Sequence, residues 1–258
     1  MVEAKQRVAV VTGGLAGIGL AISQALLAAG LRVVIGTRSG GGAKARSAVE
    51  QNLGADASIY PLDVRDEASV TAFFEAVTQD IGEVDILVNS AGVTAHETVS
   101  GHSLSSWQDV LETNLTGPFL TIRACLPGMK ARGWGRIVNL ASTAARTAVA
   151  DHPAYCASKA GLLGLSRAVA LEGAPCGVSC VTVSPTWVET DMLRQSAAIM
   201  ANKSGRSYDA EIAALAAVNP QNRLVQPQEV AALVAFLCSD AAPALTMEDI
   251  SVNAGAHW

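Results

Sequence analysis

A tyrosine and a lysine stand four positions apart in the segment AYCASKAGLLGL, residues 154–165. Residues at this spacing share one face of an α-helix, with Cβ atoms about 5–6 Å apart. A phenol with a pKa near 10 is poorly matched to proton transfer at pH 7. An ammonium group about 4–5 Å away favours the phenolate by about 3–4 kcal/mol at an effective dielectric constant of about 20. We therefore predict a proton-transfer pair in which Lys159 lowers the pKa of Tyr155; the alternative is a core tyrosine beside a solvated lysine.

Two other polar residues could complete such a site. Ser142 ends the β-like run GRIVNLAS, where its hydroxyl could hold a substrate oxygen and stabilise charge that develops on it. Asn114 lies in ETNLTG, within a stretch of helical spacing. Without their partners, Ser142 would pass for a turn residue at a strand end and Asn114 for an amide with a local hydrogen bond.

A glycine-rich turn, TGGLAGIG, joins the first β-like run to an apolar helix and contains Thr12, Gly13, Gly17, Ile18 and Gly19. Glycines let a backbone turn sharply and approach a pyrophosphate, and a helix N-terminus offers free N–H groups there. The spacing differs from the common G-x-G-x-x-G, so a plain tight turn is the alternative.

The second β-like run ends in Thr37 and Arg38. An NAD-binding chain usually has Asp or Glu near this position to bind the ribose 2′-hydroxyl. A guanidinium can instead bind a 2′-phosphate through two hydrogen bonds. We therefore expect NADP(H) to be favoured and NAD(H) to be possible; a solvated loop charge is the alternative role of Arg38.

The elements that would position these residues alternate between strands and helices. This order predicts an α/β fold: a Rossmann-like, doubly wound parallel sheet of about seven strands with helices on both faces, in three αβα layers and a single domain, 1–258. The expected strands are residues 7–12, 32–37, 57–62, 84–90, 135–142, 177–183 and 249–253. The expected helices are Ile18–Ala29, Ser69–Ile81, Ser105–Arg132, Tyr155–Glu172 and Gln228–Ser239.

Composition narrows the class of protein. The chain of 258 residues is 50% hydrophobic and carries a formal net charge of -5 without a basic stripe, which argues against a nucleic-acid partner. We find no secretion signal and no apolar run long enough to span a bilayer, so we expect no membrane partner and a cytoplasmic location. The five cysteines show no metal-binding spacing, so we expect thiols in a reducing compartment and no metal site.

TGGLAGIG, NSAG at 89–92, Asn114, Ser142 and Tyr155-x-x-x-Lys159 together resemble the short-chain dehydrogenase/reductase family over essentially the whole chain. The resemblance implies a catalytic tetrad of Asn114, Ser142, Tyr155 and Lys159, in which Asn114 anchors a water and Lys159 also binds the nicotinamide ribose. The cofactor-binding residues that it implies, together with those argued above, are Thr12, Gly13, Gly17, Ile18, Gly19, Thr37, Arg38, Asp63, Val64, Asn89, Ala91, Gly92, Tyr155, Lys159, Pro185, Val188 and Thr190.

The stretch after the sixth strand departs from the family. SPTWVET has Thr186 where the family usually has glycine, which has wider backbone freedom. We expect a largely irregular segment over Ser184–Ser207 and a substrate lid near 184–220. Trp187, Met192, Leu193 and Met200 could form its apolar face, or they could be ordinary packing. Thr94, His96 and His152 are expected near the cleft, and the two histidines are assigned no role.

The motifs ETNLTG, GRIVNLAS and RLVQPQEVA are most similar to 3-oxoacyl thioester reductases and polyketide ketoreductases. We therefore expect an NADPH-dependent carbonyl reductase, a short-chain oxidoreductase acting on CH–OH groups, with Tyr155 as general acid and base. The alternatives are an NAD-dependent dehydrogenase of a small secondary alcohol and, more remotely, a non-catalytic nucleotide-binding regulator. The resemblance also implies a homotetramer built on the helices that carry Asn114 and Tyr155. Substrate identity, stereochemistry and physiological direction stay open.

Overall fold

A parallel β-sheet of seven strands forms the centre of the protein. We describe it from a computed structural model that covers residues 6–40, 42, 47, 49, 51 and 53–256, so both ends of the predicted domain 1–258 lie outside the described residues. The strands stand in the order β3-β2-β1-β4-β5-β6-β7. Their bounds are β1 Val8–Thr12, β2 Arg32–Thr37, β3 Ala57–Pro61, β4 Val84–Asn89, β5 Gly135–Leu140, β6 Val178–Pro185 and β7 Asp249–Val252.

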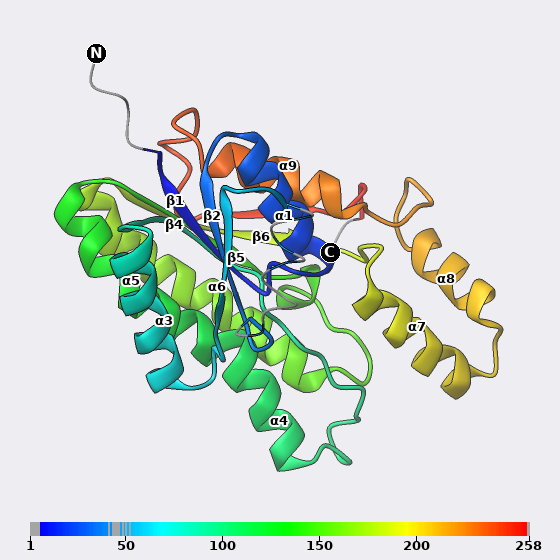
Figure 1. The fold of residues 1–258 in the computed structure, drawn as a ribbon. Helices are drawn as coiled ribbons and strands as arrows, with labels where there is room; N and C mark the ends of the chain where they lie inside the picture. The colour runs from blue at the N-terminus through cyan, green and yellow to red at the C-terminus, as the bar shows by residue number, and fades with distance from the viewer. Residues whose placement is uncertain are drawn as a thin grey trace.

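Helices cover both faces of this sheet, as Figure 1 shows. Helices α1 and α9 pack on one face, and α3, α5 and α6 pack on the other, with α4 below α6. The bounds of the helices are α1 Gly17–Ala28, α3 Glu67–Asp80, α4 Leu104–Leu111, α5 Gly117–Arg132, α6 Pro153–Gly173, α7 Asp191–Ser204, α8 Tyr208–Ala217 and α9 Pro227–Leu237. The predicted three-layer αβα fold is confirmed.

The alternation of side chains along β1 explains why the sheet is buried on both sides. Ala9 and Val11 face the core beneath α1 and α9, whereas Val8 and Val10 face the core beneath α3, α5 and α6. All four are at most 2% exposed. A parallel sheet covered by helices on both faces needs apolar residues at every strand position, which is why β1 reads as a continuous apolar run.

The strand order reverses between β1 and β4, because β2 lies on one side of β1 and β4 on the other. In doubly wound sheets the loops after such neighbouring strands diverge to opposite faces and leave a crevice at the carboxyl ends. The β1–α1 loop and the segment after β4 flank this crevice, and both contain predicted cofactor residues.

The predicted irregular segment Ser184–Ser207 is wrong, because helix α7 occupies Asp191–Ser204. Thr190 caps α7 by accepting a hydrogen bond on Oγ1 from the Leu193 N–H at 3.3 Å. Leu193, Ala197 and Ala201 are buried at intervals of four residues, which gives α7 one apolar face. Helices α7 and α8 pack together and project from the body of the molecule (Figure 1), within the range predicted for a lid, 184–220.

The predicted helix Ser105–Arg132 is helical throughout but not uniform. Between α4 and α5 lies a π-helical turn, Glu112–Thr116. None of the helices in the described part of the chain is long and apolar enough to span a membrane.

Candidate active site

The β1–α1 loop brings its backbone close to the segment that follows β4. Gly13 and Gly17 have φ angles of +68° and +50°, a region that side chains rarely adopt. A Cβ on Gly13 would lie 3.0 Å from the Cα of Ala91, and a Cβ on Gly19 would collide with the carbonyl oxygen of Gly13. The glycines are therefore required for the loop itself, and they leave backbone N–H groups of the α1 N-terminus open to a ligand.

Thr12 and Asn89 fix the two loops that form this crevice. Thr12 Oγ1 accepts hydrogen bonds from the N–H groups of Ser90 and Ala91, both at 3.1 Å. Asn89 accepts one from Thr121 Oγ1 and donates one to Asn139 Oδ1, both at 2.8 Å. Both side chains are nearly fully buried. Thr12 therefore holds the backbone that follows β4, and Asn89 links β4 to α5 and β5.

A cleft of about 230 Å³ opens between these loops. Its lining contains ten of the predicted cofactor residues: Gly13, Gly17, Ile18, Gly19, Ala91, Gly92, Tyr155, Lys159, Pro185 and Thr190. The glycine cradle and the elongated run of loops at the carboxyl ends of the strands fit a dinucleotide. The sequence-predicted residues that lie outside this lining are Thr12, Thr37, Arg38, Asp63, Val64, Asn89 and Val188.

Thr37 ends β2 and the exposed Arg38 follows it, close enough to Asp63 for its charge to lower the pKa of that carboxyl group. The main cause of the lowered pKa of Asp63 is its hydrogen bonding to Arg65, whose Nε and Nη2 donate at 2.9 and 2.6 Å. Arg65 also pairs with Asp109 at 2.5 Å. The sequence analysis missed Arg65, for which the only signal is a cation two residues after an acid.

Lys159 is buried beneath the cleft, with 5% of its surface exposed. Its Nζ donates a hydrogen bond to the carbonyl oxygen of Leu140 at 2.6 Å and lies 5.6 Å from the centroid of the Tyr155 ring. Burial lowers the pKa of Lys159 from 10.5 to about 8. The predicted neighbourhood of the two side chains is therefore observed. Burial makes the ammonium group of Lys159 less stable than it would be in water, and a nearby anion would favour it.

The predicted net lowering of the Tyr155 pKa is wrong for this structure, in which that pKa is raised. Burial raises the pKa of the Tyr155 phenol, and a hydrogen bond with the Ser142 side chain opposes that rise. The physical reason is that burial removes the phenol from water, which disfavours its charged form. Positive charge near the phenol would oppose this effect of burial by favouring the phenolate.

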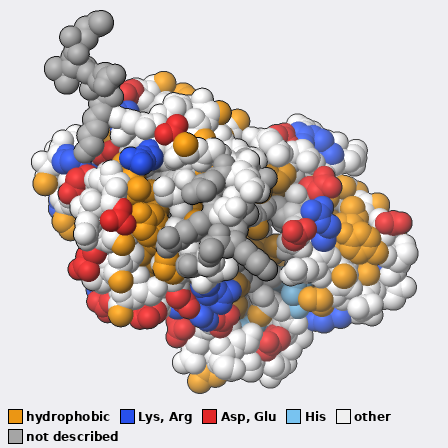
Figure 2. Space-filling view, viewed as in Figure 1, with side chains coloured by type: hydrophobic (Ala, Val, Ile, Leu, Met, Phe, Trp, Pro, Cys, Tyr) orange, Lys and Arg blue, Asp and Glu red, His pale blue; other side chains and the backbone are white. Residues whose placement is uncertain are grey.

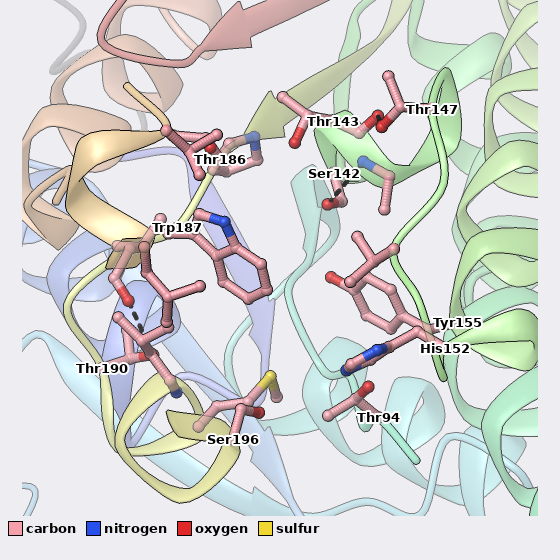
Figure 3. Close-up of a pocket in the computed structure, with 18 of the residues that line it drawn as sticks. Thr94, Ser142, Thr143, Thr147, His152, Tyr155, Thr186, Trp187, Thr190 and Ser196 are labelled. Atoms are coloured by element: carbon pink, nitrogen blue, oxygen red, sulfur yellow. Dashed lines mark hydrogen bonds between the residues drawn. The ribbon is translucent and has the colours of Figure 1, made fainter. Parts of the chain in front are cut away.

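Ser142 follows β5 and begins the short 3₁₀ turn Thr143–Ala145. Its Oγ accepts a hydrogen bond from the Ala144 N–H at 3.1 Å. Because that bond uses only a lone pair, the hydroxyl hydrogen can be donated to another oxygen, such as that of Tyr155. Figure 3 shows Ser142 and Tyr155 on the same side of the cavity.

Asn114 lies in the π-helical turn between α4 and α5 and is fully buried. Its side chain exchanges two hydrogen bonds of 2.9 Å with the backbone of Val93, and its Nδ2 also donates to Ser158 Oγ at 3.1 Å. A Cβ on Gly92 would come within 3.4 Å of Asn114 Oδ1 and 3.8 Å of Lys159 Nζ. Asn114 thus ties the segment after β4 to α6 without touching Lys159 directly, and Gly92 keeps the space between them open.

A second cavity of about 430 Å³ adjoins the cleft and lies beneath the α7–α8 lobe. Figure 2 shows this face of the molecule hollowed between the main body and that lobe. Ser142 and Tyr155 line one wall and Trp187 the opposite one (Figure 3). The other predicted lid residues, Met192, Leu193 and Met200, line the same cavity. The apolar lining and the few polar groups are typical of a site for a small organic substrate. Tyr155 lines both the cleft and this cavity.

Thr186, the departure from the family, fits its position without strain. Its φ is not among the positive values of the described residues, so a side chain is allowed there. The Thr186 hydroxyl donates to Oδ1 of the fully buried Asn219 at 3.2 Å. The loop after β6 is therefore joined to the end of α8 by a contact that a glycine could not make.

Comparisons with known proteins agree with this geometry. Residues 13–257 match the family model described as Enoyl-(Acyl carrier protein) reductase. A Streptomyces virginiae protein described as the ketoacyl reductase of a monensin polyketide synthase is 38% identical, over 99% of this chain and 98% of its own length. D-threitol dehydrogenase of Mycolicibacterium smegmatis is 39% identical, over 96% of this chain and 92% of its own. A solved structure of a phenylalanine-to-tryptophan variant of actinorhodin polyketide ketoreductase with NADPH superposes with a TM-score of 0.92, at 36% identity and 98% coverage of both chains.

A match of this extent assigns the class: the chain belongs to the short-chain dehydrogenase/reductase family and is an oxidoreductase. The predicted likeness to polyketide ketoreductases and 3-oxoacyl thioester reductases is confirmed as well, because the 3-oxoacyl-[acyl-carrier-protein] reductase of Salmonella typhimurium is 36% identical over 97% of both chains.

Proposed function

We propose that the chain is an NADPH-dependent carbonyl reductase that acts on a 3-oxoacyl or polyketide-like ketone, with Tyr155 as general acid. The observation that carries the proposal is the place of Tyr155, which lines both the glycine-bordered cleft and the larger cavity. Only a group at such a junction can exchange a proton with a substrate whose carbon reacts with a cofactor in the neighbouring cleft.

Each residue of the site has a role in this reaction. The chemistry that bound NADPH supplies is a hydride for the carbonyl carbon. Tyr155 donates its phenolic proton to the carbonyl oxygen, and the hydroxyl of Ser142 donates a hydrogen bond to the same oxygen as charge develops there. Lys159 stabilises the phenolate that remains and holds the nicotinamide ribose. In the oxidising direction Tyr155 accepts the proton as general base.

The cofactor proposal also rests on residues of this chain. Gly13, Gly17 and Gly19 shape a loop that leaves the backbone N–H groups at the N-terminus of α1 open to a pyrophosphate. Arg38 is exposed at the end of β2, where a 2′-phosphate would lie, and its guanidinium matches phosphate geometry. Val188 and Thr190 are proposed contacts of the carboxamide and phosphates, although the Thr190 hydroxyl already bonds the Val188 carbonyl oxygen at 3.3 Å.

The Tyr155→Phe variant tests the proposal, because it removes one oxygen and keeps the ring. We expect kcat for ketone reduction to fall by about 10²–10⁴-fold while NADPH binds with unchanged Kd. Tyr60→Phe is the matched control, since Tyr60 lies on β3 and lines neither cavity. Near-normal turnover by Tyr155→Phe would remove Tyr155 from the mechanism.

A second candidate is oxidation of a small secondary alcohol with NAD, which the likeness to D-threitol dehydrogenase favours. The larger cavity also contains threonine and serine hydroxyl groups that would suit a polyol. The ratio of kcat/KM for NADPH and NADH, measured with a ketone panel and an alcohol panel, separates the two candidates. A clear NADH preference with alcohols would replace the first proposal by the second.

We also propose a homotetramer that forms through α5 and α6. Phe119 on α5 and Leu171 on α6 are 44% and 65% exposed, whereas the neighbouring Leu120 and Ala170 are buried. Closed symmetric assemblies commonly bury such exposed apolar side chains. Light scattering at micromolar concentration should give the mass of four chains, and a monomer alone would refute the proposal.

A further inference from the structure

The larger cavity contains a buried hydroxyl group that no described residue satisfies. Thr94 lines this cavity, and its Oγ1 is buried without a hydrogen-bond partner among the described residues. Buried hydroxyl groups normally have partners, because leaving one unpaired costs its whole desolvation penalty. An unpaired hydroxyl at the wall of a cavity therefore indicates a polar atom of the ligand.

His152 supplies a second polar atom beside it. The ring lines the same cavity and is 5% exposed, and its Nδ1 lies 2.6 Å from the carbonyl oxygen of Ala150. A carbonyl oxygen only accepts, so in the neutral ring the hydrogen lies on Nδ1 and Nε2 carries a lone pair. No described residue makes a hydrogen bond to that Nε2. Figure 3 shows His152 between Thr94 and Tyr155 along one wall of the cavity.

The ring of His152 is held in place by His96, which in turn contacts helix α7. The His96 ring packs edge-on against it, with 4.3 Å between centroids, and His96 Nε2 lies 3.0 Å from Ser196 Oγ on α7. Lys203, also on α7, donates to the His96 carbonyl oxygen at 3.2 Å and to Asp151 Oδ2 at 3.0 Å. Burial lowers the pKa of His96 to about 4, so His96 is neutral at pH 7. Contacts with α7 thus hold the uncharged ring of His96 against His152.

We propose that Thr94 and His152 bind a hydroxyl group of the substrate, so that the chain acts on ketones that carry a hydroxyl close to the reacting carbonyl. A hydroxyl can accept a hydrogen bond from Thr94 and donate one to His152 Nε2, which satisfies both groups. A second carbonyl oxygen has no hydrogen to donate and would leave Nε2 without a partner. A plain acyl chain would leave both unpaired. This inference deepens the proposed function and rests on it.

Matched pairs of thioesters test the proposal, since each pair exchanges a hydroxyl for a methyl group of similar size. The N-acetylcysteamine thioesters of 4-hydroxy-3-oxobutanoate and 3-oxopentanoate form one pair. Those of 5-hydroxy-3-oxopentanoate and 3-oxohexanoate form the other, with the hydroxyl one carbon further away. We expect kcat/KM to favour the hydroxylated member of at least one pair by about tenfold or more, because a site that binds a hydroxyl rejects the analogue without it.

Two variants remove the proposed contacts with little change of shape. Thr94→Val and His152→Phe should each bring that ratio close to one. Thr147→Val is the matched control: Thr147 lines the same cavity, but its hydroxyl already donates to the Thr143 carbonyl oxygen, so the ratio should be unchanged. If His152→Phe does not fold, the more conservative Thr94→Val decides. A wild-type ratio near one in both pairs, or a ratio that survives both substitutions, would overturn the proposal.

A binding measurement separates this inference from the proposed function. Trp187 lines the cavity, so quenching of tryptophan fluorescence reports ligand binding without turnover. The same tenfold preference is expected in Kd. Absence of reduction with every ketone would reject the proposed function, while the Kd ratio would still confirm or overturn the hydroxyl site.

Discussion

The cleft and the larger cavity meet at Tyr155 but are built from different parts of the chain. The cleft is formed by loops at the carboxyl ends of β1, β4 and β5, and its shape depends on glycine backbone and on buried hydrogen bonds such as those of Thr12. The cavity is closed by side chains of α7 and α8, which project from the body of the molecule. The sheet and its loops therefore determine the shape of the cleft, whereas the shape of the larger cavity depends on individual side chains.

This difference separates cofactor binding from substrate choice. Most of the residues proposed to bind the cofactor lie at the carboxyl ends of paired strands, where a change of backbone disturbs the sheet. The α7–α8 lobe has a small core of its own, Leu193, Ala197 and Leu215, so its cavity-facing side chains can vary without disturbing the sheet. Such a division lets one fold serve many substrates. Substitutions at the two regions should therefore affect different kinetic constants.

The largest expected effect in the cleft comes from Lys159→Met. We expect kcat to fall by about 10³-fold, because the phenolate of Tyr155 loses its neighbouring charge. We also expect the cofactor-free variant to be more stable than the wild type at pH 7, by up to about 3 kcal/mol, because the buried ammonium group is no longer desolvated. Activity assays and urea unfolding measure the two changes.

The sign of the pH dependence follows from the lowered pKa of Lys159, about 8 against an ordinary value of 10.5. Between these values the unfolded chain binds more protons than the folded one, so the wild type gains stability as pH rises from 8 to 10.5. The stability advantage of Lys159→Met should therefore shrink over this range. A difference that stays constant between pH 7 and pH 10.5 would show that Lys159 is not buried as a cation.

A smaller and more selective effect is expected at the end of β2. Arg38→Ala should lower the ratio of kcat/KM for NADPH over NADH by about 10–100-fold, because a charge-assisted hydrogen bond to a phosphate is worth about 1.5–3 kcal/mol. The KM of the ketone should not change, since Arg38 lies outside the lining of the larger cavity. Arg32→Ala, at the opposite end of the same strand, is the control. An unchanged ratio would mean that a group other than Arg38 distinguishes NADPH from NADH.

The same division explains what the sequence could predict. The strand order and the glycine loop follow from local rules, because β-branched runs such as that of β1 and turns such as TGGLAGIG are read from neighbouring residues. Ten of the predicted cofactor residues line one cleft for this reason. Tyr155 and Lys159 share a helix, so their spacing alone placed them together.

The remaining features depend on contacts between distant segments. The raised pKa of Tyr155 results from burial in the folded chain, which spacing does not reveal. Arg65 pairs with Asp63 and also with Asp109, which lies 44 positions further along the chain. Helix α7 could have been found locally, because Thr190 followed by apolar residues every four positions is a typical helix start. The role proposed for the two histidines could not be predicted from the sequence, because only the fold places His96 against His152.

The smallest effect is expected from a substitution in the loop between β6 and the α7–α8 lobe. Thr186→Val keeps the shape of the side chain but removes the hydroxyl that donates to the buried Asn219 Oδ1. The loss of that bond should destabilise the protein by about 1–2 kcal/mol, because it leaves a buried acceptor without this donor. Loosening of the loop that carries Trp187 should raise the KM of the ketone a few-fold while the KM of NADPH stays constant.

Thr186→Ser is the matched control, because it retains the hydroxyl and should retain most of the stability and the ketone KM. Thermal unfolding and steady-state kinetics with each substrate varied in turn provide the measurements. A change in the KM of NADPH that equals the change for the ketone would contradict the separation of the two regions. Since Thr186 stands between β6 and α7, such a result would show that the sheet and the lid respond as one unit.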